Sequence, residues 1–146
     1  MMRRIIGTFL VTVCALAPAV QAQTAADSAA IKQAALDYIE GWYEGNAERM
    51  ERAVHPDLAK RIVISRPDSG SALRNMTAAQ LIDGVRQGYG KRTPKEKQLK
   101  DVRILDIFRN TAAVRIDASD WIDYLHLAKF NGRWVIINVL WELKQS

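Results

Sequence analysis

The sequence predicts an α+β protein in which helices cover one face of an antiparallel sheet. Apolar residues recur at helical spacing in segments before residue 90 and alternate at strand spacing after residue 99. The strongest local signal is Asn131–Gly132, which lies between the apolar runs Tyr124–Phe130 and Trp134–Leu143. Both turn residues tolerate the positive φ of a type I′ turn, so the two runs are predicted to form a hairpin. Helices followed by meandering strands are typical of α+β domains.

Two helices are predicted first. The N-cap types Asp27 and Ser28 precede an apolar stripe with helical spacing, and Gly45–Asn46 is a left-handed stop signal. The stripe consists of Ile31, Ala35, Tyr38 and Trp42. A short second helix, Ala47–Val54, ends before Pro56 because a residue that precedes proline avoids the helical region.

The strands and a third helix follow. The β-branched run in Leu58–Ser65 predicts a strand, and Arg66–Asn75 is predicted to be a loop because it contains Pro67 and Gly70. Thr77 and Gln80 form a capping-box pattern ahead of a helix that ends near Gly88. Alternation then predicts two further strands before the hairpin, at Leu99–Phe108 and Ala112–Ala118.

The N-terminus has the pattern of a secretory signal peptide. Arg3 and Arg4 precede the apolar run Ile5–Leu16, and Val20–Ala22 is a small-x-small cleavage site. We expect cleavage after Ala22, which leaves a single domain, residues 23–146, in the periplasm or outside the cell. An uncleaved anchor is the alternative, but the run is shorter than the ~20 residues of a membrane-spanning helix.

Composition excludes several classes of function. Cys14 is the only cysteine and lies in the predicted signal, after the bulky Val13, so we expect neither a lipid anchor nor a disulfide. The mature chain has 19 basic residues against 16 acidic ones, a mild net charge of +3. The basic segment Lys91–Lys100 contains no aromatic residue, which favours a solvated loop over a nucleic-acid surface. No nucleic acid is expected as a partner, and no membrane after signal cleavage.

Three segments carry a resemblance to a known family. They are YIEGWYEGN at Tyr38–Asn46, HPDL at His55–Leu58, and the hairpin sequence at Asp123–Trp141. Together with the element order, they resemble the nuclear transport factor 2-like superfamily, and within it the putative lumazine-binding proteins, close to the SnoaL-like polyketide cyclases. The resemblance covers roughly residues 29–143. It implies a cone, a strongly bent antiparallel sheet wrapped around N-terminal helices, with a pocket at its open end. Ketosteroid isomerase and scytalone dehydratase share this fold with non-catalytic binders and dimer modules, so the fold leaves the function open.

His55 and Asp120 are the candidate catalytic residues. In this fold, a side chain that follows the second helix can reach the mouth of the pocket, and imidazole exchanges protons near neutral pH. Asp120 would supply the carboxylate. Alternatively, His55 caps a helix end or fills the corner before Pro56. Asp57 either orients the imidazole or caps the start of the following strand, and the cap is the favoured interpretation.

The candidate ligand-binding residues are mostly aromatic. In a strand, Tyr124 and His126 share one face and Trp121 and Asp123 share the other, but a period of two does not tell which face is inside. Aromatic residues on the first helix would line the pocket in the resembled fold, or would simply pack in the core. The predicted set is Tyr38, Trp42, His55, Trp121, Tyr124 and His126.

Three hypotheses of function remain open. The first is an exported small-molecule-binding protein, and the second is a cofactor-free lyase or isomerase with a His or Asp base. The third is an interaction module, because the apolar run Trp134–Leu143 could be buried in a homodimer. No metal or cofactor is expected, since the sequence has two distant histidines and neither a phosphate-binding glycine loop nor a nucleophile motif.

Overall fold

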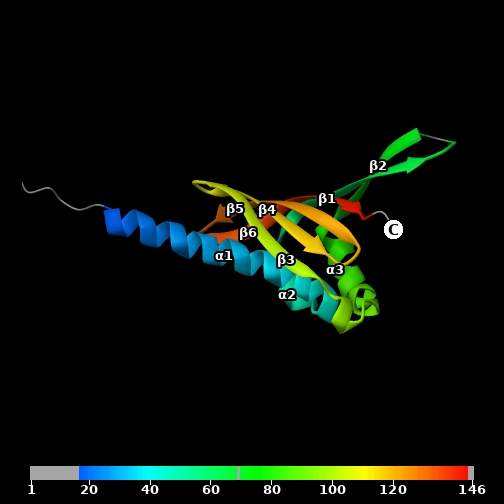
Figure 1. The fold of residues 1–146 in the computed structure, drawn as a ribbon, viewed down its shortest axis with the longest axis horizontal. Helices are drawn as coiled ribbons and strands as arrows, with labels where there is room; N and C mark the ends of the chain where they lie inside the picture. The colour runs from blue at the N-terminus through cyan, green and yellow to red at the C-terminus, as the bar shows by residue number, and fades with distance from the viewer. Residues whose placement is uncertain (1–16, 69, 145–146) are drawn as a thin grey trace, which may run out of the picture.

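A computed structural model describes residues 17–68 and 70–144, with side chains from residue 24 onward. Its helices and strands follow one another along the chain as drawn in Figure 1. In order they are α1 (Ala17–Glu44), α2 (Ala47–Ala53), β1 (Val54–Arg66), β2 (Gly70–Thr77), α3 (Ala78–Arg86), the 3₁₀ turns η1 (Tyr89–Arg92) and η2 (Lys95–Lys97), β3 (Lys100–Phe108), β4 (Thr111–Ala118), β5 (Trp121–Phe130) and β6 (Arg133–Leu143).

The strands form one six-stranded sheet in the order β2-β1-β6-β5-β4-β3. The pairs are antiparallel except for β1 and β6, which run parallel. The sheet curls around α1, and the β1–β2 hairpin projects from the body of the molecule (Figure 1). This is the predicted α+β cone, with α1 lying in the concave face of a bent and unclosed sheet.

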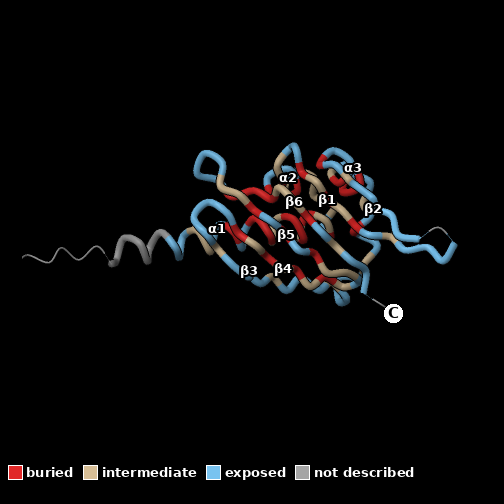
Figure 2. The backbone as a smooth tube through the Cα atoms, turned by 90° about the horizontal axis from the view of Figure 1, so that it is seen from above, coloured by how far each residue is buried: buried red, intermediate tan, exposed pale blue. Residues whose placement is uncertain are grey.

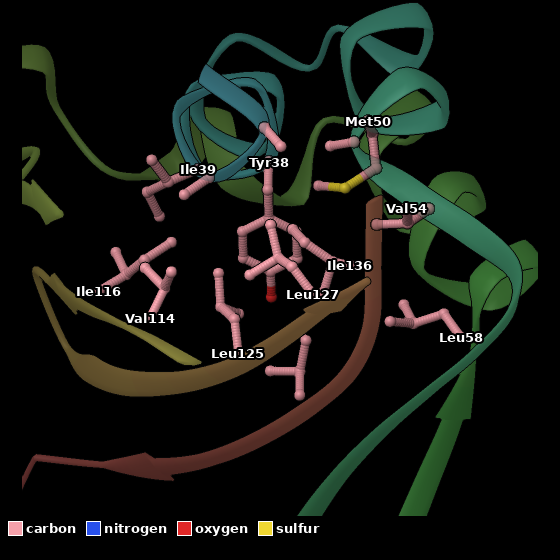
Figure 3. Close-up of a cluster of buried hydrophobic side chains, with 14 of the residues drawn as sticks. Tyr38, Ile39, Met50, Val54, Leu58, Val114, Ile116, Leu125, Leu127 and Ile136 are labelled. Carbon is pink, nitrogen blue, oxygen red and sulfur yellow. The ribbon is translucent and has the colours of Figure 1, made fainter. Parts of the chain in front are cut away.

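The core lies between α1 and the concave face of the sheet. Three residues of the predicted helical stripe, Ile31, Ala35 and Tyr38, are buried, and Trp42 is half-buried. Buried residues recur along β4, β5 and β6, whereas most of the projecting hairpin is exposed (Figure 2). Figure 3 shows Tyr38 pointing from α1 towards the sheet among aliphatic side chains such as Leu125 and Leu127.

The predicted start of the first helix is wrong. The helix begins at Ala17 and continues through Asp27 and Ser28. The Ser28 hydroxyl donates to the Thr24 carbonyl one turn earlier, at 2.9 Å. The Asp27 carboxylate accepts instead from the sheet, from Lys129 Nζ at 2.7 Å and Trp134 Nε1 at 3.0 Å. Residues 1–16 of the predicted signal lie outside the described residues.

The predicted loop Arg66–Asn75 is also wrong, because most of it belongs to strand β2. Only residues 67–69 separate β1 from β2, which pair antiparallel from Ala59 opposite Thr77 to Arg66 opposite Gly70. Every residue from Gly70 to Asn75 is exposed, so this strand carries no alternation of apolar and polar residues. Backbone hydrogen bonding to β1 therefore decides its structure without a local sequence signal.

The local turn signals are confirmed. Asn131 and Gly132 have φ angles of 50° and 80°, as a type I′ turn requires. The capping box is formed by two hydrogen bonds, from the Thr77 amide to the Gln80 side chain at 2.9 Å and from the Gln80 amide to the Thr77 hydroxyl at 3.3 Å. These elements depend on neighbouring residues only, which is why the sequence predicts them.

Gly90 is the contact point between η1 and α1, and Gly90→Ala should destabilise the fold strongly. A Cβ at this position would lie 2.0 Å from the Trp42 carbonyl oxygen, and backbone cannot move aside as a side chain can. We expect a loss of about 3 kcal/mol, at the upper end of the cost of overpacking. Urea unfolding followed by tryptophan fluorescence measures it.

Gly70→Ala is the matched control for this glycine substitution. Its Cβ would have no neighbour within 4 Å, and only its φ of +71° opposes a side chain. The expected cost is therefore about 1 kcal/mol. Equal losses in the two variants would contradict the close packing of η1 on α1.

Candidate functional site

A cavity of about 480 Å³ lies beside α1, between the inner face of the sheet and the α3–η1 segment. This size is typical of small-molecule sites. Its wall is mainly apolar and aromatic, and consists of Trp42, Met76, Leu81, Tyr89, Trp121, Trp141 and Leu143. Its polar and charged residues are Tyr38, Lys60, Arg74, Arg92, Thr93 and Asp120.

Three tryptophans from separate elements shape the wall. Trp42 lies on α1, Trp121 opens β5, and Trp141 lies near the end of β6. The rings of Trp42 and Trp121 meet edge to face, with centroids 6.4 Å apart and planes at 80°. This geometry is favoured by the ring quadrupoles, so the two side chains hold each other in place.

Lys60 lies at the floor of the cavity and forms a buried ion pair with Asp123, which is behind it. The two residues are 7% and 0% exposed, and Lys60 Nζ lies 2.7 Å from Asp123 Oδ1. Lys60 also donates to the Tyr38 hydroxyl at 2.8 Å, and Trp121 Nε1 donates to the second carboxylate oxygen, Oδ2, at 2.6 Å. The Trp141 ring lies under the ammonium, 4.7 Å from its centroid. Both oxygens of the buried carboxylate therefore have a donor, as a buried charge requires.

Burial shifts the pKa values in this network. It lowers the pKa of the Lys60 ammonium, although the neighbouring Asp123 carboxylate opposes part of the shift. Burial also raises the pKa of Tyr38 well above its ordinary value of 10.0, and the negative charge of Asp123 adds to the increase. Tyr38 therefore keeps its proton at neutral pH and offers a neutral hydroxyl beside the cavity.

Charged side chains surround the more exposed part of the cavity. Arg74 comes from β2, Arg92 from η1, and Asp120 from the turn before β5. The Arg92 guanidinium lies over the Tyr89 ring, 4.9 Å from its centroid. Segments far apart in the sequence thus contribute to one opening.

The structure places four of the predicted site residues on this cavity. Tyr38 and Trp42 reach it from α1, and Asp120 and Trp121 reach it from the start of β5. Tyr38 is buried against the floor, whereas Trp42 and Trp121 are only half-buried and form the wall.

His55 lies away from this group, and the structure does not bring it together with Asp120. Its ring stacks on Phe130, with centroids 4.8 Å apart, and Phe130 is at the opposite end of β5 from Asp120. Ten residues of strand correspond to about 30 Å. His55 Nδ1 accepts from the Asp57 backbone amide at 3.1 Å, while the Asp57 carboxylate is 93% exposed. The geometry therefore provides no joint acid–base site for His55 and Asp120.

Tyr124 and His126 also lie outside the cavity, on the convex face of the sheet. Tyr124 is 47% exposed and His126 is exposed, while Asp123, Leu125 and Leu127 of the same strand are buried. The sequence left open which face is inside, and the structure places Tyr124 and His126, two of the predicted ligand-binding residues, on the outer face. The reason is that α1 covers the face that carries the alternating aliphatic residues.

Sequence reasoning missed Lys60 and Asp123. A signal was present, because Lys60 shares the inward face of its strand with Leu58 and Ile62, and Asp123 shares that of Leu125. A charge within an apolar alternation indicates either an edge of the core or a buried partner.

Within residues 17–68 and 70–144, no cluster of three or more His, Cys, Asp or Glu side chains could hold a metal ion. None of the helices in these ranges is long and apolar enough to cross a bilayer.

Comparison with known proteins identifies the family. The family described as "Putative lumazine-binding" matches residues 26–142, and the chain belongs to it. None of the curated proteins matches the sequence.

Solved structures agree on the fold. An NTF2-like protein of unknown function from Shewanella baltica is similar over 84% of this chain and 97% of its own, with a TM-score of 0.65 and 20% identity. An NTF2-like protein with a cystatin-like fold from Novosphingobium aromaticivorans is similar over 92% of this chain and 93% of its own, with a TM-score of 0.66 and 11% identity. The hexachlorocyclohexane dehydrochlorinase LinA-type3 from Novosphingobium barchaimii is similar over 86% of this chain and 91% of its own, with a TM-score of 0.61 and 10% identity. At these identities the likeness shows the nuclear transport factor 2-like fold alone.

The buried ion pair should respond to substitution as a coupled unit. Asp123→Asn leaves the Lys60 ammonium buried without its counter-charge, so we expect a loss of about 3–5 kcal/mol. The double variant Lys60→Met/Asp123→Asn should lose less than the sum of the single losses, because no uncompensated charge remains. Chemical denaturation of the four proteins gives the coupling energy.

The exposed pair Arg103–Asp101, 3.1 Å apart, provides the control. Asp101→Asn should cost less than about 1 kcal/mol because water screens this pair. A loss from Asp123→Asn no greater than that from Asp101→Asn would show that the buried pair does not stabilise the cavity floor.

Proposed function

We propose that this protein is an exported, small-molecule-binding member of the nuclear transport factor 2-like superfamily, and that its ligand occupies the cavity between Trp42, Trp121 and Trp141. The observation that carries the proposal is an aromatic cavity of about 480 Å³ with Lys60, held by Tyr38 and Asp123, at its polar floor. Ligand sites generally combine apolar walls with a few polar groups that orient the ligand.

The walls favour a ligand with a planar ring. Indole faces and edges from three elements offer stacking surfaces, and such contacts add to the gain from apolar burial. The Tyr38 hydroxyl and the Lys60 ammonium at the floor supply polar contacts for a heteroatom. The family description, which names lumazine, a fused heteroaromatic ring, supports this class of ligand.

The site geometry supports binding more strongly than acid–base catalysis. A cofactor-free lyase or isomerase needs a proton acceptor that faces the ligand. His55 lies outside the cavity, and both oxygens of Asp123 already accept hydrogen bonds. Asp120 is the remaining carboxylate on the wall.

Binding should depend on the indole of Trp42. The uncharged fluorophore N-phenyl-1-naphthylamine serves as the probe, since it becomes fluorescent in apolar surroundings. We expect Trp42→Leu to weaken its binding about tenfold, because the variant loses an aromatic contact worth roughly 1 kcal/mol together with part of the apolar wall. Fluorescence titration measures the dissociation constants.

Tyr124→Leu is the matched control, since it removes an aromatic ring from the convex face. Its affinity should equal that of the wild type. If both variants bind like the wild type, or if the probe does not bind at all, the cavity is not the ligand site.

We further propose that two copies associate through the convex face. Tyr124 and Leu140 are cross-strand partners there, 47% and 54% exposed, and form an apolar patch on β5 and β6.

Leu140→Glu places a charge in this patch, so the variant should be a monomer where the wild type is a dimer. Sedimentation equilibrium measures the two masses. Leu73→Glu, at an equally exposed position on the projecting hairpin, should remain a dimer. If the wild-type protein sediments with the mass of one chain, the dimer is overturned.

The proposed export predicts that the mature protein secreted by its host begins at Gln23. Sequencing of its N-terminus tests this, and any other first residue would overturn the cleavage site.

A further inference from the structure

We infer that the cavity selects an organic anion, a planar ring that carries an acid group, and that Arg74 and Arg92 bind that acid group at the mouth. This inference rests on the proposed function, because it requires a ligand in the cavity. It goes further by specifying the charge of the ligand and its orientation, with the ring between the tryptophans and the acid group outward.

The charges around the cavity do not balance. Lys60, Arg74 and Arg92 are the cationic residues that line it, and Asp120 is the acidic one. The Lys60 charge is neutralised by Asp123 directly behind it, at 2.7 Å. Arg74 and Arg92 then face a single carboxylate, so the opening keeps one excess positive charge. Walls of low polarity strengthen the field of such a charge on a ligand.

The guanidinium groups of Arg74 and Arg92 are available to a ligand. Among the described residues, neither guanidinium has an ion pair or a side-chain hydrogen bond, and that of Arg92 lies over the Tyr89 ring. By contrast, carboxylates within the chain hold Arg49 and Arg115. A guanidinium stays charged and matches a carboxylate, sulfonate or phosphate group with two parallel hydrogen bonds.

The two arginines come from separate elements that border the cavity. Arg74 and Met76 are two residues apart on β2, so their side chains lie on the same face of the β1–β2 hairpin. Met76 and its cross-strand partner Lys60 both line the cavity, so this face is the one that borders it. Arg92 is in η1, which is packed against α1 where Gly90 meets the Trp42 backbone. Each arginine is thus attached to an element that also supplies cavity wall. An acid group held by both would position its ring against Trp42.

A pair of probes that differ by one acid group tests the inference. 1-Anilinonaphthalene-8-sulfonate carries the ring system of N-phenyl-1-naphthylamine together with a sulfonate. We expect the sulfonate to bind about tenfold more tightly than the neutral probe, because a charge-assisted hydrogen bond contributes roughly 1.5 kcal/mol to the binding free energy. This preference should weaken at high salt, because the arginines are exposed.

Substitution of the arginines should remove the preference. Arg74→Gln and Arg92→Gln should each weaken binding of the sulfonate about tenfold and leave the neutral probe within about twofold. Arg66→Gln is the matched control, since it removes the same charge from the end of β1, outside the cavity. It should change neither dissociation constant.

The outcomes separate this inference from the proposed function. If both probes bind equally well and only Trp42→Leu weakens them, the anion preference is overturned and the cavity remains a binding site. If Arg66→Gln weakens the sulfonate as much as Arg74→Gln does, the effect is a general surface charge and the inference is also overturned. If Trp42→Leu affects neither probe, the proposed function fails together with the inference.

Discussion

The ion pair between Lys60 and Asp123 is the interaction on which the site depends. The two residues lie on β1 and β5, which are not neighbours in the sheet, so the pair crosses the concave face over β6. Burying two charges is costly unless every polar atom is satisfied. Tyr38 from α1 and Trp121 from β5 meet that requirement, and Trp141 of β6 lies under the ammonium. One polar network therefore joins the helix to three strands at the level where the cavity begins.

The first helix changes its role along its length. Ile31 and Ala35 are fully buried in the core, and the hydroxyl of Tyr38 accepts a hydrogen bond from Lys60 at the floor of the cavity. One turn later, Trp42 is half-buried and faces the cavity. A single apolar stripe thus packs in the core along most of its length and lines the cavity at its last turn.

The fold hosts many functions, so the function of this chain depends on the residues at its candidate site. The cavity combines three tryptophans in its wall with the Lys60–Asp123 pair at its floor and, at its mouth, two guanidinium groups that have no ion pair among the described residues. They combine apolar contact with a field for negative charge. Of the predicted acid–base pair, Asp120 lies on the cavity wall before β5, whereas His55 of β1 stacks on Phe130 at the other end of that strand.

The sequence predicts the features that depend on neighbouring residues. The turn at Asn131–Gly132, the capping box at Thr77 and the apolar stripe of α1 are specified by backbone preferences and helical spacing. It also determined that Tyr124 and His126 share a face, but not that this face is the outer one. The packing of α1 decided that, because it covers the side that carries Leu125 and Leu127. The pairing of β2 with β1 and the contact between Lys60 and Asp123, 63 residues apart, likewise arise only when the chain folds, since no local preference encodes a partner so far away.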